Sequence, residues 1–164
     1  MANFTEQMQN IFQAYVDEIG HDPVSLDVVA EWAVANGLFH PAPRSVTKLC
    51  REALAESLRQ ERRLDAEGRL YRSKHPVRTS VGGVQLTLWA DIDTAPRVHM
   101  ERSFAQRRRS IVDDCFQIKQ DVDHYNAYRA GELSIQMVLS FDEDVAELEA
   151  LRDKGQSEKR RRGS

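Results

Sequence analysis

The sequence predicts an α+β protein that is predominantly helical, with an N-terminal helical part, a strand and a long-helix C-terminal region. Three observations lead to this fold class. Apolar residues recur at three- and four-residue steps through much of the first third of the chain, which is typical of helices that bury one face. Two short strand-like runs flank residues 65–68, whose composition favours a turn. Apolar residues at seven-residue intervals then predict one long helix over residues 96–129.

Three helices are expected before the first strand. The first spans residues 4–19 and ends at Gly20, a residue that suits a helix C-terminus. The second follows Ser25, whose hydroxyl group is a good N-cap, and ends near Gly37. The third spans about residues 44–61 and follows a turn that contains two prolines. Each helix has one apolar face and one polar face, so each is expected to pack on a neighbour.

A basic hairpin is expected over residues 62–74, directly after the third helix. Apolar and polar residues then alternate over residues 84–92, which predicts a single strand, because successive side chains of a strand point to opposite faces. Beyond the long helix, residues 135–141 form an apolar run that fits more than one type of structure. Three consecutive acids suit the first turn of a last helix that ends near Leu151. Residues 155–164 are basic and poor in apolar residues, and are predicted to be disordered.

The formal charge of −3 conceals a segregation of charge along the chain. Residues 1–40 contain six acids and neither Lys nor Arg, whereas residues 41–80 contain ten basic residues against five acids. The near-neutral total is therefore a cancellation between blocks. A basic block inside an otherwise acidic chain favours a polyanionic partner more clearly than the overall charge does.

The sequence argues against several classes of protein. No window approaches the roughly 18 consecutive apolar residues that a membrane-spanning helix requires, and the N-terminus lacks the features of a secretory signal. Cys50 and Cys115 lie far apart in apolar helical patterns, with no CxxC motif. They are expected to be buried thiols rather than disulfide partners or zinc ligands. These features favour a cytoplasmic location.

Four consecutive segments between residues 4 and 75 carry a family resemblance. They are the capped helix SLDVVAEWAVANG, the turn LFHPAP, the third helix RSVTKLCREALAESL and the hairpin RRLDAEGRLYRSK. Their order resembles a winged helix-turn-helix DNA-binding domain. The resemblance implies such a domain over residues 1–78, followed by a strand, a long helix and a C-terminal helix over residues 79–154 and by the disordered tail. Members of this family place the third helix in the major groove and the hairpin along the backbone or in the minor groove.

The expected DNA contacts come from the third helix and the hairpin. Arg44, Thr47, Lys48 and Arg51 recur at three- and four-residue steps, so they project from one side of the helix. Arg51 suits the edge of a guanine base, whereas Lys48 suits a phosphate. The full set predicted to bind DNA is Arg44, Ser45, Thr47, Lys48, Arg51, Arg62, Arg63, Arg69, Arg72 and Lys74.

Two other functions remain open at this point. The first is a winged-helix adaptor or assembly module that contacts protein and not DNA, because Glu52 and Glu56 lie on the third helix and acids dominate the first two. The second is a magnesium-dependent nuclease, since Asp91 and Asp93 stand near a strand end and carboxylates bind magnesium. No recognised catalytic motif is present, so a transcriptional regulator without enzymatic activity, metal or cofactor is the preferred hypothesis.

The long helix predicts self-association. At about 50 Å it is too long for a small monomer to cover, and a dimer would place two winged helices on a palindromic site. The alternative is that residues 135–141 and the last helix fold back over its apolar row. Arg107, Arg108 and Arg109 are expected to form a solvated face with acidic partners such as Asp113. The apolar row, called the seam below, consists of Phe104, Ile111, Cys115, Ile118, Val122 and Tyr125.

Overall fold

The computed structural model describes residues 4–39 and 46–162, which form five helices and two antiparallel hairpins. Helices account for most of these residues, so the expected α+β class with predominant helix is confirmed. The chain divides into two compact units, Met1–Cys50 and Arg51–Ser164. Each unit has its own small set of buried apolar side chains.

In the first unit, α1 (Phe4–Ile19) and α2 (Leu26–Ala35) are the two helices that the sequence predicts. The Tyr15 ring meets Trp32 edge-on, with 5.5 Å between the ring centroids. The Ser25 hydroxyl accepts a hydrogen bond from the backbone two residues ahead and so caps α2. The most buried apolar side chains of this unit are Tyr15, Val29 and Ala33.

The third predicted helix is α3 (Val46–Gln60), which lies within the bounds expected from the sequence. Arg44 and Ser45, two of the predicted DNA contacts, lie outside the described residues. At the other end of the helix, the Arg59 guanidinium lies over the Trp89 ring, 5.7 Å from the ring centroid. This cation–π contact anchors the last turn of α3 in the second unit.

The first hairpin pairs β1 (Arg62–Leu64) with β2 (Leu70–Arg72) and confirms the predicted hairpin. Its turn is closed by a 3.1 Å hydrogen bond from the Asp65 N–H to the Arg69 carbonyl. Gly68 adopts a φ of +73°, a conformation that L side chains rarely take. The glycine in the predicted turn at residues 65–68 is therefore required by the backbone conformation of the turn.

A second hairpin pairs β3 (Lys74–Val81) with β4 (Val84–Asp91) in register along their full length. The sequence predicts β4 but not β3. Gly82 and Gly83 have φ values of +57° and +79°, as the two-residue turn of a tight hairpin requires. This turn therefore connects β4 to a strand that the sequence did not predict.

The second hairpin also changes the expected limits of the basic hairpin and of the N-terminal domain. Lys74 was expected in the basic hairpin, but it is the first residue of β3. The domain boundary expected at residue 78 falls inside β3, where Arg78 is paired with Thr87 of β4. Backbone hydrogen bonds from Ser73 to Glu61 and from Ile92 to Ser73 connect the two hairpins.

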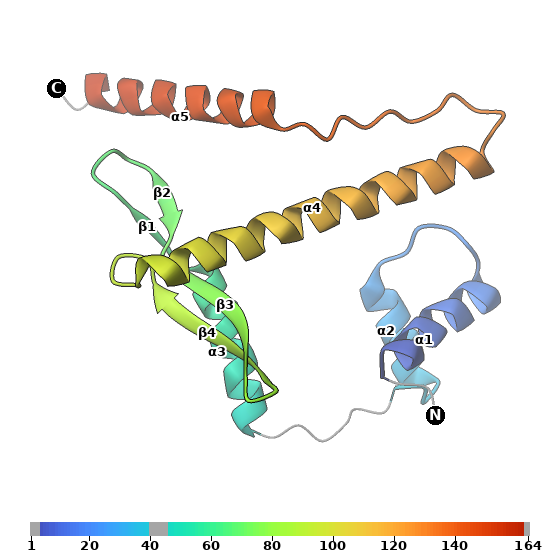
Figure 1. Cartoon of the computed structure of the whole chain (residues 1–164). Helices are drawn as coiled ribbons and strands as arrows, with labels where there is room; N and C mark the ends of the chain where they lie inside the picture. The colour runs from blue at the N-terminus through green and yellow to red at the C-terminus, as the bar shows by residue number, and fades with distance from the viewer. Residues whose placement is uncertain (1–3, 40–45, 163–164) are drawn as a thin grey trace. The chain divides into compact units, whose positions relative to one another are not determined.

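The N-terminal part of α4 (Arg97–Tyr128) packs on β3, as Figure 1 shows. The Ser103 hydroxyl donates a 2.9 Å hydrogen bond to the Pro76 carbonyl. The Phe104 ring meets His75 edge-on at 5.5 Å between centroids. The buried side chains of this contact include Val77 and Met100. The predicted long helix is thus confirmed over nearly its full expected range.

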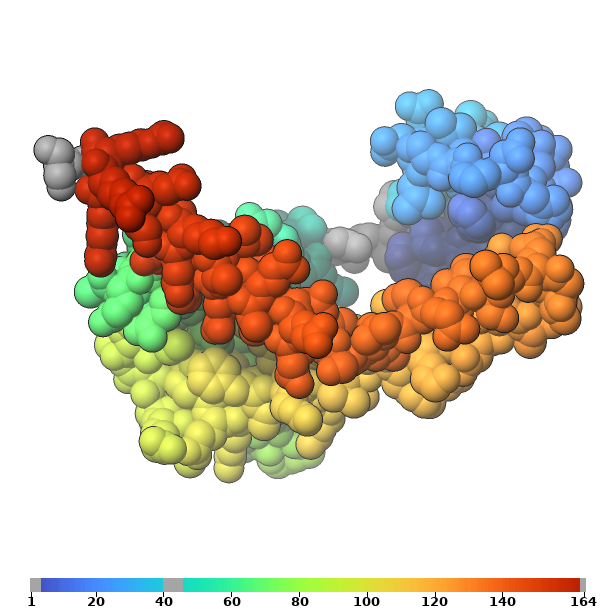
Figure 2. Space-filling view, turned by 90° about the horizontal axis from the view of Figure 1, so that it is seen from above, coloured from blue at the N-terminus to red at the C-terminus, as the bar shows by residue number. Residues whose placement is uncertain are grey.

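The last helix, α5 (Asp142–Arg162), is longer than the sequence predicts. It includes residues 155–162, which were expected to be disordered. Its first turn holds three acids and its last turn four basic residues. Acids near the N-terminus and cations near the C-terminus interact favourably with the helix dipole, so the charges stabilise both ends. Its side chains stand out from the helix along its length, as Figure 2 shows, so helix propensity and charge stabilise it rather than burial. Residues 133–141 form no helix or strand.

Both cysteines are free thiols, but the expectation that both are buried is wrong. Cys50 is exposed on α3, and Cys115 is half-buried on α4. Most of the apolar face of α3 is open, since Val46, Leu49 and Leu54 are exposed as well, whereas Leu58 is half-buried. None of the helices in the described part of the chain has the length and apolar content that a membrane crossing requires.

Candidate nucleic-acid interface

α3 carries the described part of the predicted recognition surface. Thr47 and Lys48 lie in the first turn, and Arg51 follows one turn later. All three side chains are exposed. The helix therefore presents hydroxyl, ammonium and guanidinium groups from one side, which is the division of faces that insertion into a major groove requires.

Two of the predicted hairpin contacts are engaged inside the protein. The Arg63 guanidinium donates to both carboxylate oxygens of Asp91, at 2.9 and 2.6 Å, and to Asp93 at 2.8 Å. The Lys74 ammonium lies 2.7 Å from the same Asp91 carboxylate. Hydrogen bonds from Arg63 and then Lys74 hold the pKa of Asp91 well below its usual range. Arg63 of β1 thus connects the two hairpins, whereas Lys74 pairs with Asp91 within the second hairpin, and both charges are neutralised locally.

Arg69 is engaged in a similar way, but within its own turn. Its Nε atom lies 2.6 Å from the Asp65 carboxylate, and one Nη atom lies 3.2 Å from Glu67. The hydrogen bond from Arg69 lowers the pKa of Asp65. Of the hairpin residues predicted to bind DNA, this leaves Arg62 and Arg72 as the cations with no carboxylate partner among the described residues.

The carboxylates considered for a magnesium site belong to the same ion-pair network. Asp91 is occupied by Arg63 and Lys74, and Asp93 accepts a 3.0 Å hydrogen bond from the Tyr71 hydroxyl in addition to its pair with Arg63. Over residues 4–39 and 46–162, no three His, Cys, Asp or Glu side chains are grouped so that they could hold a metal ion. The ion pairs account for the Asp91 and Asp93 pattern.

Three arginines lie near Arg72. We call the four together the arginine cluster: Arg59 on α3, Arg62 on β1, Arg72 on β2 and Arg107 on α4. Burial lowers the pKa of the Arg72 guanidinium. The nearby like charges lower it further, in the order Arg107, Arg62 and Arg59. The Arg72 Nε atom is buried and has no hydrogen-bond partner within the described residues. The cluster thus combines mutual repulsion with an unsatisfied donor.

The cluster is only weakly compensated by acids. Arg62 donates through Nη1 to two backbone carbonyls, at 2.6 and 3.1 Å, which leaves its charge uncancelled. Arg59 lies 3.8 Å from Glu56, and both of these side chains are more than half exposed. Such an exposed pair contributes little. The cluster is therefore a region of positive potential on an otherwise acidic chain.

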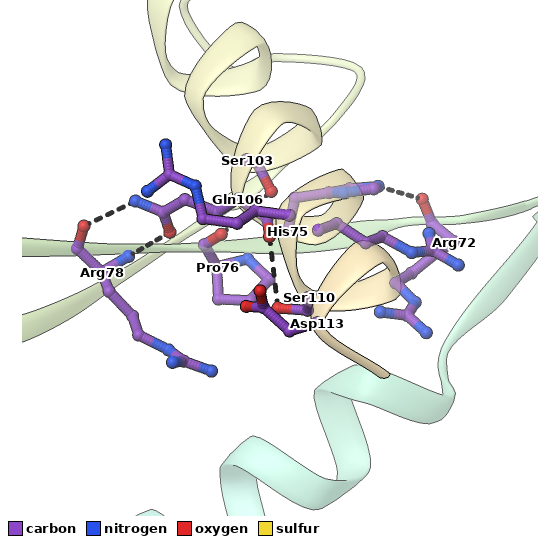
Figure 3. A pocket seen from close by; sticks show the side chains of 10 residues that line it. Arg72, His75, Pro76, Arg78, Ser103, Gln106, Ser110 and Asp113 are labelled. Atoms are coloured by element: carbon purple, nitrogen blue, oxygen red, sulfur yellow. Dashed lines mark hydrogen bonds between the residues drawn. The ribbon is translucent and has the colours of Figure 1, made fainter. Parts of the chain in front are cut away.

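A pocket of about 390 Å³ lies between β3 and α4, next to the arginine cluster. Figure 3 shows Arg72 and Arg78 at opposite ends of it, with Gln106 and Ser110 of α4 between them. Arg107 and Arg109 also line the pocket, and Asp113 is the one carboxylate among its described lining residues. The pocket is open to solvent and its lining is rich in guanidinium groups, so it favours an anion.

The walls of this pocket are fixed by hydrogen bonds. The Gln106 amide accepts from the Arg78 N–H at 2.9 Å and donates to the Arg78 carbonyl at 2.8 Å, as a neighbouring strand would. His75 is 4% exposed, and its Nε2 lies 2.8 Å from the Arg72 carbonyl. Because a carbonyl only accepts, this nitrogen carries the proton. Burial lowers the pKa of His75, which favours the neutral ring.

Arg59 and Arg107 were not among the residues predicted to bind DNA. Arg107 is exposed, as expected, but no described carboxylate forms the ion pair with it that the sequence predicted. The signal was the spacing of polar residues on α4, because Ser103, Gln106, Arg107 and Ser110 recur at three- and four-residue steps. That spacing indicates a polar face of α4 that packs on a neighbouring element. The neighbour is β3, the strand that the sequence did not predict.

No family model, curated protein or solved structure matches this chain. Any statement of function consequently depends on the geometry above and on the order of elements.

Proposed function

We propose that the protein binds double-stranded DNA and regulates transcription, as a winged-helix domain with a helical C-terminal region. In this proposal α3 enters the major groove and the arginine cluster contacts backbone phosphates. The observation behind the proposal is the arginine cluster: Arg107, Arg62 and Arg59 lie near enough to lower the pKa of Arg72, and Arg72 and Arg107 line the same pocket. Like charges held together cost stability unless a polyanion neutralises them.

The exposed face of α3 supplies the second part of the argument. Arg51 lies on the same helix as Arg59, which is itself fixed by the Trp89 ring. A helix anchored at its last turn by the Trp89 ring can present its other end to base edges. Phosphate contacts from the cluster would fix its register on the duplex, while the residues of α3 would read sequence.

The proposal changes which hairpin residues contact phosphates. Arg63, Lys74 and Arg69 are engaged by internal carboxylates, so we assign them to stability. Arg62 and Arg72 keep their predicted role, and Arg59 and Arg107 join them. The proposed role is binding without catalysis.

The alternative function is a winged-helix adaptor that contacts protein only. The observation in its favour is the open apolar row of α3, in which Val46, Leu49 and Leu54 are exposed. An adaptor has no need for a salt-sensitive affinity for nucleic acid, so salt dependence discriminates between the two functions.

The test is fluorescence anisotropy of a labelled random-sequence duplex over a range of salt concentrations. We expect binding that weakens steeply with salt, and Arg62→Ala should reduce the slope of log K against log salt by about 0.9, as for one lost phosphate contact. Arg51→Ala should weaken binding as well. Arg97→Ala is the matched control, because Arg97 is exposed on α4 and paired with Glu101. Absence of any salt-sensitive binding contradicts DNA binding and favours the adaptor.

A further inference from the structure

We propose that the pocket between β3 and α4 binds a phosphate group, and that Arg72 and Arg107 are its principal ligands. This inference deepens the proposed function and rests on it only for one of the two sources of phosphate considered below.

The charge of the pocket fits a phosphate. Its lining includes the guanidinium groups of Arg72, Arg78, Arg107 and Arg109, against the single carboxylate of Asp113. Guanidinium groups bind phosphate oxygens through paired, charge-assisted hydrogen bonds. A bound phosphate would relieve the repulsion between Arg72 and Arg107, which otherwise disfavours the charged state of Arg72. No described residue supplies this compensation from within the chain.

An unsatisfied donor strengthens the assignment. The Nε atom of Arg72 is buried and lacks a hydrogen-bond partner in the described ranges, and a buried donor without a partner is costly. Arg72 lines the pocket, so an oxygen bound there can approach its guanidinium group. Ser110 lies on the same wall, but its hydroxyl donates to the Gln106 carbonyl at 3.2 Å, so the arginines are the donors that face a phosphate.

The pocket is also held in place before any ligand binds. The paired hydrogen bonds of Gln106 fix α4 to β3 at Arg78. Ser103 fixes the same two elements at Pro76, and His75 fixes the backbone at Arg72. The ligand therefore meets walls that need little rearrangement, which lowers the cost of binding.

Size and openness indicate what carries the phosphate. A volume of about 390 Å³ lies within the range of small-molecule pockets and exceeds what a phosphate ion fills. The mouth is open to solvent, so the phosphate can remain attached to a larger molecule. Two sources share this chemistry: a phosphodiester of the DNA backbone, and a free phosphate monoester such as a mononucleotide.

The test compares two neighbouring arginines of α4. Arg107 lines the pocket, whereas Arg108 is exposed next to it and does not. Binding of inorganic phosphate and of a mononucleotide is measured by calorimetry, and binding of a duplex by anisotropy, for the unmodified protein, Arg107→Gln and Arg108→Gln. We expect Arg107→Gln to weaken phosphate binding about ten- to hundredfold, as loss of a charged hydrogen bond does, and Arg108→Gln to leave it unchanged.

The outcomes separate the two sources. If Arg107→Gln weakens both the small ligands and the duplex, the pocket takes a backbone phosphate. If it weakens only the small ligands, the pocket takes a free monoester. The inference is overturned if neither small ligand binds and the two variants bind the duplex equally. If the small ligands bind but no variant binds a duplex, the proposed function fails and the phosphate pocket stands.

A second measurement covers the case in which Arg107→Gln unfolds. In the unmodified protein, the ring signals of His75 are followed by NMR as inorganic phosphate is added. His75 lines the pocket, so a bound anion should shift these signals in a saturable manner. Signals that do not move at saturating phosphate contradict the assignment without any substitution.

Discussion

The guanidinium group of Arg63 joins the two hairpins, because it extends from β1 and holds Asp91 at the end of β4. We expect Arg63→Ala to lower the melting temperature by several degrees, since Asp91 would keep only Lys74 as a close cation. Thermal unfolding followed by circular dichroism measures the change. Arg69→Ala, which removes exposed ion pairs within one turn, should have a much smaller effect. Equal melting temperatures for both variants would show that the network does not stabilise the fold.

His75 predicts a pH dependence of stability. Burial lowers its pKa, and the charges of Arg72, Arg107 and His99 act in the same direction. The folded state thus holds this proton more weakly than the unfolded state. Stability is complete above the ordinary histidine pKa of about 6.5 and declines as the pH falls through that value toward the folded pKa.

The corresponding measurement is urea unfolding at about pH 7 and about pH 5. We expect the midpoint to fall at the lower pH, because protonation favours the unfolded chain. His75→Gln retains an N–H donor but does not titrate, so this variant should lose less stability over the same interval. If both proteins lose the same amount, other groups cause the decline.

The sequence predicts which residues are basic but not which of them are compensated. Arg69 and Asp65 stand four residues apart, and their pairing is visible locally. Arg63 and Asp91 are separated by 28 residues, so their pairing depends on how two hairpins meet. Residues such as Arg63 were consequently predicted to bind DNA, although a carboxylate distant in the sequence neutralises their charge. Arg107 was missed for the converse reason, because its distant neighbours are cations.

At the scale of elements, the β3–β4 turn depends on two glycines with positive φ. An alanine at Gly83 must adopt a φ near +79°, which costs about 1 kcal/mol or more. We therefore expect Gly83→Ala to lower the free energy of unfolding by that amount, measured in urea.

Gly155 provides the matched control, because it lies inside α5 with no atom within 4 Å of an added Cβ. There the same substitution improves helix propensity by about 0.5–1 kcal/mol. It should raise helicity in circular dichroism. A destabilised Gly155→Ala, or an unaffected Gly83→Ala, contradicts the roles assigned to the two glycines.

The helices were predictable because their apolar periodicity is local, and α1, α2, α3 and α4 follow it within a few residues. β3 was not predictable in this way, because Pro76 and the polar residues that follow it obscure the alternation of buried and exposed side chains in the sequence. The end of α5 was missed for a different reason. It buries almost nothing, so composition indicated disorder, although its charges suit a helix.

At the scale of the molecule, the expected boundary at residue 78 came from assigning the whole first half to one domain. The compact units instead divide between Cys50 and Arg51, within α3. Long-range strand pairing explains the difference, since β3 joins β4 and packs on α4 within the second unit. The basic block of residues 41–80 therefore spans both units.

The seam of α4 predicts dimerisation. The helix has 32 residues, a length of about 48 Å at 1.5 Å per residue. Ile111, Ile118 and Tyr125 are 49%, 42% and 44% exposed, although they recur at the seven-residue spacing of a helix–helix contact. Apolar side chains left open at this spacing favour a second copy of the helix as their partner. Residues of the segment after α4 do fold back onto the helix near Val122, where Asn126 and Ile135 exchange two hydrogen bonds of 2.9 Å, but the three seam residues above stay exposed.

Sedimentation at increasing protein concentration tests the dimer. Ile111→Asp should convert the dimer to a monomer, because the new charge would be buried at the centre of an apolar contact without a partner. Val112→Asp is the matched control. Val112 is equally exposed at 49% but lies outside the seam, so the dimer should persist. A symmetric dimer would also place two arginine clusters on one duplex, and Ile111→Asp should then reduce duplex affinity more than Val112→Asp does. A protein that stays monomeric at every concentration contradicts the role of the seam.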